Sequence, residues 1–228
     1  MSEAQAAPAK AYSTLLPSQL GWREKTVNRI TSILLWLWLK LRYGVRVVGQ
    51  ENIPSYQNGI QGLIAVANHT SNWDPPLMSM ALLPLPVSYM AKQELFKNRF
   101  LAAYFALTGA FAVNRAKLET ATIRSAKTVV QHGGWALGMF PEGTRVKAEN
   151  GMPAAPQQLK RGAAFMARLT KADVLPLGFA RREGPGRPAY AVSIGAPVRT
   201  SLLDEEAQIM EAIQVGIETQ MQIAQNLL

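Results

Sequence analysis

Short apolar runs alternate with longer amphipathic segments along most of the chain. The apolar runs have the length and the β-branched content that strands favour, and they cover residues 43–50, 61–67, 87–92, 110–115, 135–140, 174–180 and 189–198. Apolar positions recur at helical spacing in the other segments, at residues 18–42, from 74 onward, 94–109, 118–134, 159–172 and 201–228. This alternation predicts an α/β fold with a largely parallel, twisted sheet flanked by helices.

The length of the chain, 228 residues, favours a single domain with a sizeable core. We expect residues 1–42 to be a flexible start followed by an N-terminal helical segment. Residues 43–228 should form one domain that ends in an amphipathic helix, with Ser201 and Asp204 as its start signals. The isoleucines that share one face of this last helix are Ile209, Ile213 and Ile217.

Residues 30–39 (ITSILLWLWL) form the most apolar stretch of the N-terminal segment. A helix needs roughly 20 apolar residues to span a bilayer, so this stretch is too short to do so. It contains Trp36 and Trp38, and basic residues flank it, which is typical of an amphipathic helix lying in a membrane interface. A buried core helix is the alternative. Two tryptophans this close cannot both face one narrow core stripe, which favours the interfacial interpretation.

Charge and composition narrow the classes of partner. The formal net charge is +9, and the first 199 residues carry 24 basic against 10 acidic residues, a balance of +14. Such a body attracts polyanions, namely anionic lipid surfaces, phosphorylated substrates or nucleic acid. There is no cysteine, which excludes disulfides, thiolate nucleophiles and cysteine-bound zinc. Two histidines without an acidic cluster predict no metal site, and we expect no signal peptide.

Polar residues follow the predicted strands at the points where they end. His69 comes just after the buried run 61–67, and Lys92, Arg115 and Glu142 occupy corresponding positions after other strands. Because functional groups in parallel sheets gather beyond the carboxyl ends of strands, we expect these four side chains to converge.

The stretch NHTSNWD contains His69 and, five residues later, Asp74. If the chain turns from a strand into a helix here, the carboxylate can accept one ring N–H and leave the other nitrogen as a proton acceptor. That arrangement is a general base. No G-x-S-x-G stretch occurs, so we expect the base to deprotonate a substrate hydroxyl directly. The alternative is that Asp74 only caps a helix and His69 fills a polar pocket.

The stretch FPEGTR, residues 140–145, reads as a turn after a strand. Gly143 allows a tight turn that presents Glu142, Thr144 and Arg145 to the same cleft. Arg145 can hold phosphate oxygens through paired, charge-assisted hydrogen bonds, and Glu142 can orient a substrate hydroxyl or support the arginine. A polar surface turn is the alternative.

Together these stretches make the chain resemble the glycerophospholipid acyltransferase family, in particular 1-acyl-sn-glycerol-3-phosphate acyltransferases. NHTSNWD, GAFAVNR (109–115), FPEGTR and VLPLGF (174–179) match the family's four blocks in order, over about residues 40–200. The resemblance implies that Arg115 binds substrate phosphate and that Pro176 shapes the acyl-donor site. The stretches containing Lys92 and Lys160 are also similar to the family's.

The resemblance implies transfer of an acyl chain from acyl-CoA or acyl carrier protein to the free hydroxyl of 1-acyl-glycerol 3-phosphate, giving phosphatidate. No metal, cofactor or covalent intermediate is expected. His69 would be the general base, Asp74 would stabilise its imidazolium, and backbone N–H groups near the helix start would stabilise the oxyanion. Lys92, Arg115 and Arg145 would hold the acceptor's phosphate.

The expected partners are therefore a lysophospholipid, a thioester donor and a membrane surface, with peripheral or monotopic attachment on the cytoplasmic face. Alternatives remain at this point. The acceptor could be glycerol 3-phosphate or another lysophospholipid, or water in a hydrolase. A non-catalytic protein that binds anionic lipid through the same basic surface is a further possibility. Nucleic acid is not expected, because no stacking platform of aromatic and basic residues is evident.

Overall fold

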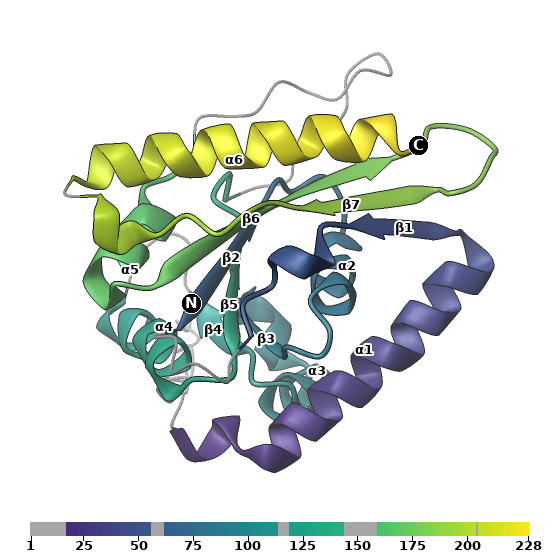
Figure 1. Ribbon diagram of the computed structural model, residues 1–228. Helices are drawn as coiled ribbons and strands as arrows, with labels where there is room; N and C mark the ends of the chain where they lie inside the picture. Colours follow the sequence, from purple (N-terminus) through teal and green to yellow (C-terminus); the bar gives the residue numbers. More distant parts are fainter. Residues whose placement is uncertain (1–16, 56–61, 114–118, 144–158, 204) are drawn as a thin grey trace, which may run out of the picture.

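A seven-stranded sheet forms the centre of the computed structural model, which describes residues 17–55, 62–113, 119–143, 159–203 and 205–228. The strand order is β1-β7-β6-β2-β5-β3-β4 (Figure 1). In chain order the strands are β1 (Val45–Val48), β2 (Leu63–Ala67), β3 (Val87–Lys92), β4 (Phe111–Val113), β5 (Ala136–Met139), β6 (Asp173–Arg181) and β7 (Tyr190–Ile194). The strands β4, β3, β5, β2 and β6 run parallel, and β7 is antiparallel to β6. The largely parallel α/β sheet is thereby confirmed.

Helices cover both faces of the sheet. They are α1 (Trp22–Arg42), α2 (Asp74–Ala81), α3 (Arg99–Leu107), α4 (Thr120–His132), α5 (Gly162–Thr170) and α6 (Glu206–Asn226). Every residue of β2 is buried because its two faces contribute to two different cores. Ile64 and Val66 pack with α4, α5 and α6, whereas Leu63, Ala65 and Ala67 pack with α1 and α2.

Two helix boundaries differ from the sequence-based expectation. The segment 94–109 is not one helix, because Asn98 ends a 3-10 turn and its side chain accepts hydrogen bonds from the N–H groups of Phe100 and Leu101 at the start of α3. The last helix begins at Glu206. Glu205 forms a capping box with Gln208, whereas Ser201 lies in a separate 3-10 turn. Asp204, the other expected start signal, lies outside the described residues.

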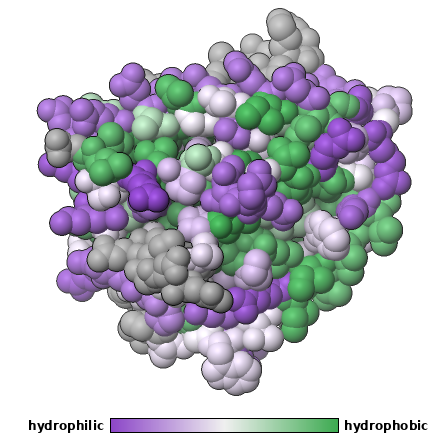
Figure 2. Space-filling view, viewed as in Figure 1, coloured by the Kyte–Doolittle hydropathy of each residue, from purple (hydrophilic) through white to green (hydrophobic). Residues whose placement is uncertain are grey.

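Helix α1 has one face on the protein and one face in solvent. Its Asn28 side chain is buried and donates to the backbone oxygens of Val87 and Thr108, at 3.1 and 3.0 Å. Figure 2 shows hydrophobic residues gathered along the edge of the molecule where Figure 1 places α1. The exposed large apolar residues of this helix are Trp22, Ile30, Ile33, Leu34, Leu37, Trp38 and Leu41. Of the described helices, none is long and apolar enough to cross a membrane.

Candidate active site

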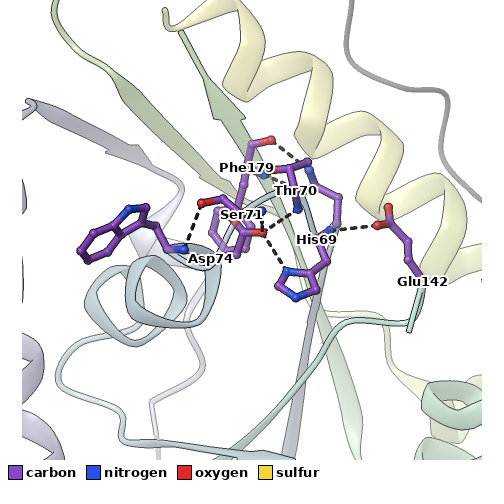
Figure 3. Close-up of polar contacts among 8 residues, drawn as sticks. His69, Thr70, Ser71, Asp74, Glu142 and Phe179 are labelled. Carbon is purple, nitrogen blue, oxygen red and sulfur yellow. Dashed lines mark hydrogen bonds and ion pairs between the residues drawn. The ribbon is translucent and has the colours of Figure 1, made fainter. Parts of the chain in front are cut away.

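The loop between β2 and α2 brings His69 and Asp74 into contact. His69 Nδ1 lies 2.9 Å from Asp74 Oδ2, and the same oxygen accepts the backbone N–H groups of Thr70 at 2.6 Å and Ser71 at 2.7 Å (Figure 3). Asp74 is the first residue of α2, and Trp73 occupies the N-cap position. The carboxylate therefore orients the histidine loop rather than capping its own helix. With Nδ1 donating to Asp74, the second ring nitrogen of His69 is left as a proton acceptor.

The histidine loop is also fixed from neighbouring strands. Asn68 is fully buried and exchanges two hydrogen bonds with the backbone of Phe179 in β6, at 2.8 and 3.0 Å. The ring of Phe140 stacks on the imidazole of His69, with a centroid distance of 4.4 Å and an angle of 25°. These contacts restrict both the backbone and the ring of His69, which favours a single orientation.

Glu142, in the turn after β5, reaches the same loop from the opposite side. Its Oε2 accepts the backbone N–H of His69 at 3.0 Å, and only 4% of the residue is exposed. Burial raises the pKa of the Glu142 carboxyl, and the hydrogen bond from the His69 backbone opposes that rise. Glu142 therefore connects the turn after β5 to the residue that carries the imidazole.

The backbone N–H groups around the histidine already have partners. Those of His69, Thr70 and Ser71 donate to the carboxylates of Glu142 and Asp74. We expected N–H groups near the start of α2 to stabilise an oxyanion. These three are committed elsewhere, so an oxyanion at this site needs other donors.

A cavity of about 700 Å³ lies beside His69 and is lined by residues of the sheet and of helices α1, α2, α3, α4 and α5. Most of its lining is apolar, and Asn28 lies where α1 meets the base of β3. Tyr89 lines the cavity, and its hydroxyl donates a hydrogen bond to Pro75 O at 2.7 Å. Burial raises the pKa of this phenol, so it remains a neutral donor. An elongated apolar group fits a chamber of this composition.

Of the other residues that we expected in the site, Lys92 and Gly143 line the cavity. Lys92 has its Nζ 3.7 Å from Glu94 Oε1 at an exposed position. Gly143 has a left-handed φ of 73°, as a tight turn requires. Arg115, Thr144 and Arg145 lie outside the described residues.

Pro176 does not reach the cavity wall. Its ring packs towards Gly216 of α6 and towards Gly195, because even-numbered residues of β6 face α6 while Leu175 and Leu177 face α1 and α2. The site residues that sequence reasoning missed are those of the apolar chamber, Tyr89 above all. Their only signal was ordinary strand and helix periodicity, which does not separate a cavity wall from a core.

Comparisons with known proteins bear on the family and the fold of the chain. The family model described as Acyltransferase matches residues 44–180. A 1-acyl-sn-glycerol-3-phosphate acyltransferase of Bacillus subtilis is 31% identical over 147 residues, which cover 64% of this chain and 66% of that protein. The enzyme of the same name from Saccharomyces cerevisiae is 29% identical over 184 residues, covering 79% of this chain and 57% of that protein. The matched part thus spans between about half and just under two thirds of the curated relatives, from 51% to 66%.

A solved structure has the same fold. The crystal structure of the 1-acyl-sn-glycerophosphate (LPA) acyltransferase PlsC from Thermotoga maritima superimposes with a TM-score of 0.67, covering 87% of this chain and 78% of that one. The sequence identity is 24%, so this comparison bears on the fold alone. The family model covers more than half of the chain and includes the histidine loop and the turn after β5. The chain belongs to the acyltransferase family.

Proposed function

We propose that this protein transfers an acyl chain from a thioester, acyl-CoA or acyl carrier protein, to the free hydroxyl of 1-acyl-glycerol 3-phosphate, giving phosphatidate. The observation that carries the proposal is the contact between His69 Nδ1 and Asp74 Oδ2 beside a largely apolar cavity. A binding protein needs no oriented base. The names of the curated relatives support the choice of acceptor.

The chemistry follows from the orientation of the imidazole. The unbonded ring nitrogen of His69 accepts the hydroxyl proton as the acceptor oxygen attacks the thioester carbonyl. Asp74 stabilises the imidazolium that results. When the tetrahedral intermediate collapses, the carbon–sulfur bond breaks and the thiolate receives the proton from His69. The products are an ester and a free thiol, and the histidine returns to its starting state.

Positions for the two substrates form part of this proposal, and they are supported by the lining of the cavity and by Lys92. The acyl chain would lie in the apolar chamber beside His69, because burying methylene groups there is favourable. The acceptor's phosphate would lie towards Lys92, with Arg115 and Arg145 as further candidates from the sequence. Glu142 would serve the reaction by holding the backbone of His69 in place.

Helix α1 supports attachment to a membrane surface. Trp38 is 45% exposed and Leu41 is 75% exposed, and Lys40 and Arg42 lie beside them. Such a face would lie in the lipid interface, in a peripheral or monotopic arrangement on the cytoplasmic side. Because Asn28, Ser32 and Leu35 of the same helix line the cavity, a lipid acyl chain has a short path into it.

A product analysis tests the proposal. The purified protein is incubated with 1-acyl-glycerol 3-phosphate, glycerol 3-phosphate or another lysophospholipid, each with labelled acyl-CoA or labelled acyl carrier protein. We expect labelled phosphatidate from the first acceptor. Label found only in free fatty acid would indicate a hydrolase. Binding of lysolipid without any product from either donor would indicate a non-catalytic lipid-binding protein.

A further inference from the structure

Lys160 is held against the turn that follows β5. Its backbone N–H donates to Pro141 O at 2.8 Å, which ties the residue before α5 to that turn. The side chain then runs across Gly143. A Cβ built on Gly143 would lie 2.6 Å from Lys160 Nζ, 2.8 Å from Cε and 2.9 Å from Cδ. These contacts place the ammonium end of Lys160 directly over the turn that carries Glu142.

Gly143 serves two purposes in this arrangement. Its left-handed φ of 73° is one that side chains rarely adopt. The absence of a Cβ also leaves the space that the end of Lys160 occupies. The glycine of the FPEG stretch is thus required by the lysine as well as by the turn.

Lys160 lines the same cavity as His69. In the described part of the chain, no carboxylate comes within ion-pair distance of it, whereas Lys92 has Glu94 at 3.7 Å. The nearby carboxyl of Glu142 is buried and accepts the His69 N–H. Lys160 is therefore a cation at the reaction cavity without a neutralising partner among these residues.

We propose that Lys160 binds the phosphate of the acceptor, and that Gly143 leaves the space which the end of the lysine side chain occupies. The inference rests on the proposed function and adds to it a residue that positions the glycerophosphate. A lysine suits this task because its ammonium binds phosphate as a compact point charge. Its backbone is attached to the turn after β5, and Glu142 of the same turn bonds His69, so the charge is carried by a segment linked to the histidine loop.

Steady-state kinetics of Lys160→Met and Lys160→Arg test the proposal. Methionine keeps the apolar stem and removes the charge, which should raise KM for lysophosphatidate by roughly tenfold or more. KM for the thioester donor should not change. With an uncharged monoacylglycerol as acceptor, Lys160→Met should lose much less activity than it loses with lysophosphatidate. Lys160→Arg should retain part of the preference for the phosphate. The matched control is Lys127→Met, an exposed lysine of α4 that does not line the cavity.

A substitution of Gly143 provides a second test of the proposal. Gly143→Ala should raise KM for lysophosphatidate in the wild type, and should raise it less when Lys160 is already methionine, because the two changes remove one interaction. An unchanged KM in Lys160→Met, or an equal loss with both acceptors, would overturn the role of Lys160 while leaving the reaction intact. If the wild type transfers no acyl chain, the proposed function fails. In that case, calorimetry of lysophosphatidate binding to the wild type and to Lys160→Met decides the role of Lys160. Weaker binding to the variant supports that role, and equal binding overturns it.

Discussion

At the scale of single residues, the site depends on how tightly the ring and the backbone of His69 are held in place. Its ring is held by Asp74 and Phe140, and its backbone is held by Glu142. A general base has to present its acceptor nitrogen within hydrogen-bond reach of the substrate proton, so each of these contacts bears on rate. The sequence predicted His69 and Asp74 from their spacing. It could not predict that Glu142 bonds the His69 backbone, because that contact joins residues 73 positions apart.

Glu142 offers a prediction in which stability depends on pH. Its carboxyl has a pKa raised above the ordinary value of 4.5, so the folded state holds the proton more tightly than the unfolded state does. The wild type should therefore lose stability, relative to Glu142→Gln, as pH rises above 4.5 through the raised value. Urea denaturation over a pH series measures this difference. An identical pH dependence in the two proteins would contradict the burial of the ionisable group.

The same residue also predicts an order of activities. Glutamine keeps an oxygen that can accept the His69 N–H, whereas alanine leaves that N–H without a partner. Glu142→Gln should therefore retain more acyl transfer than Glu142→Ala, as initial rates at saturating substrate would show. Equal losses in the two variants would indicate that the charge of Glu142 acts on the substrate hydroxyl or supports Arg145, the two roles that the sequence alone left open.

Gly138 predicts the effect of narrowing the cavity. A Cβ there would lie 2.7 Å from Tyr89 Cδ1 and 2.9 Å from Val87 Cγ1, so Gly138→Ala should displace the tyrosine ring, which lines the chamber. We expect a loss of about 1–3 kcal/mol in stability and a shift towards shorter acyl donors. Adding Tyr89→Leu should restore part of both. Competition between donors of different chain length measures the shift, and an unchanged preference would place the chain elsewhere.

At the scale of elements, periodicity predicted most of the structure, and three features escaped it. The strand expected at 87–92 coincides with β3, Val87–Lys92. The break at Asn98 was missed because apolar residues continue on both sides of it. The antiparallel direction of β7 and the capping box at Glu205 depend on a loop and a side-chain pair that hydrophobic spacing does not encode.

Asn28 is predicted to fix α1 to the sheet. Replacing it with alanine leaves the carbonyl oxygens of Val87 and Thr108 without their donor in a buried setting. We expect Asn28→Ala to lower the free energy of unfolding by about 1–3 kcal/mol. Thr26→Ala, at an exposed position with only a local bond to Trp22 O, should change it by less than about 0.5 kcal/mol. Chemical denaturation compares the two, and equal effects would argue against the anchor.

The exposed face of α1 is predicted to bind membranes. Leu34 is 61% exposed and Leu41 is 75% exposed, so lysines there should fold normally but weaken binding to the lipid interface. Vesicle co-sedimentation of the double variant Leu34→Lys, Leu41→Lys measures the loss. The control is Val215→Lys on α6, where the native residue is 56% exposed. Loss of binding in the control alone would move the membrane surface to the other side of the molecule.

At the scale of the whole molecule, one helix links the surface, the chamber and the base. Helix α1 exposes an apolar face, lines the cavity with Asn28 and Ser32, and contacts the histidine loop through Trp38, whose ring lies 5.5 Å from that of Trp73. The sequence indicated an interfacial helix and a catalytic loop as separate features. Their contact could not be predicted, because it depends on how α1 packs against α2.

The central claim is that His69, oriented by Asp74, is the general base of an acyl transfer. The most direct test is the rate of phosphatidate formation by His69→Ala, with its fold checked by circular dichroism and its lysolipid binding measured alongside. We predict intact folding, retained binding and a rate lower by a factor of about 10²–10⁴ or more. A folded His69→Ala protein that forms phosphatidate at a rate near that of the wild type would contradict the account.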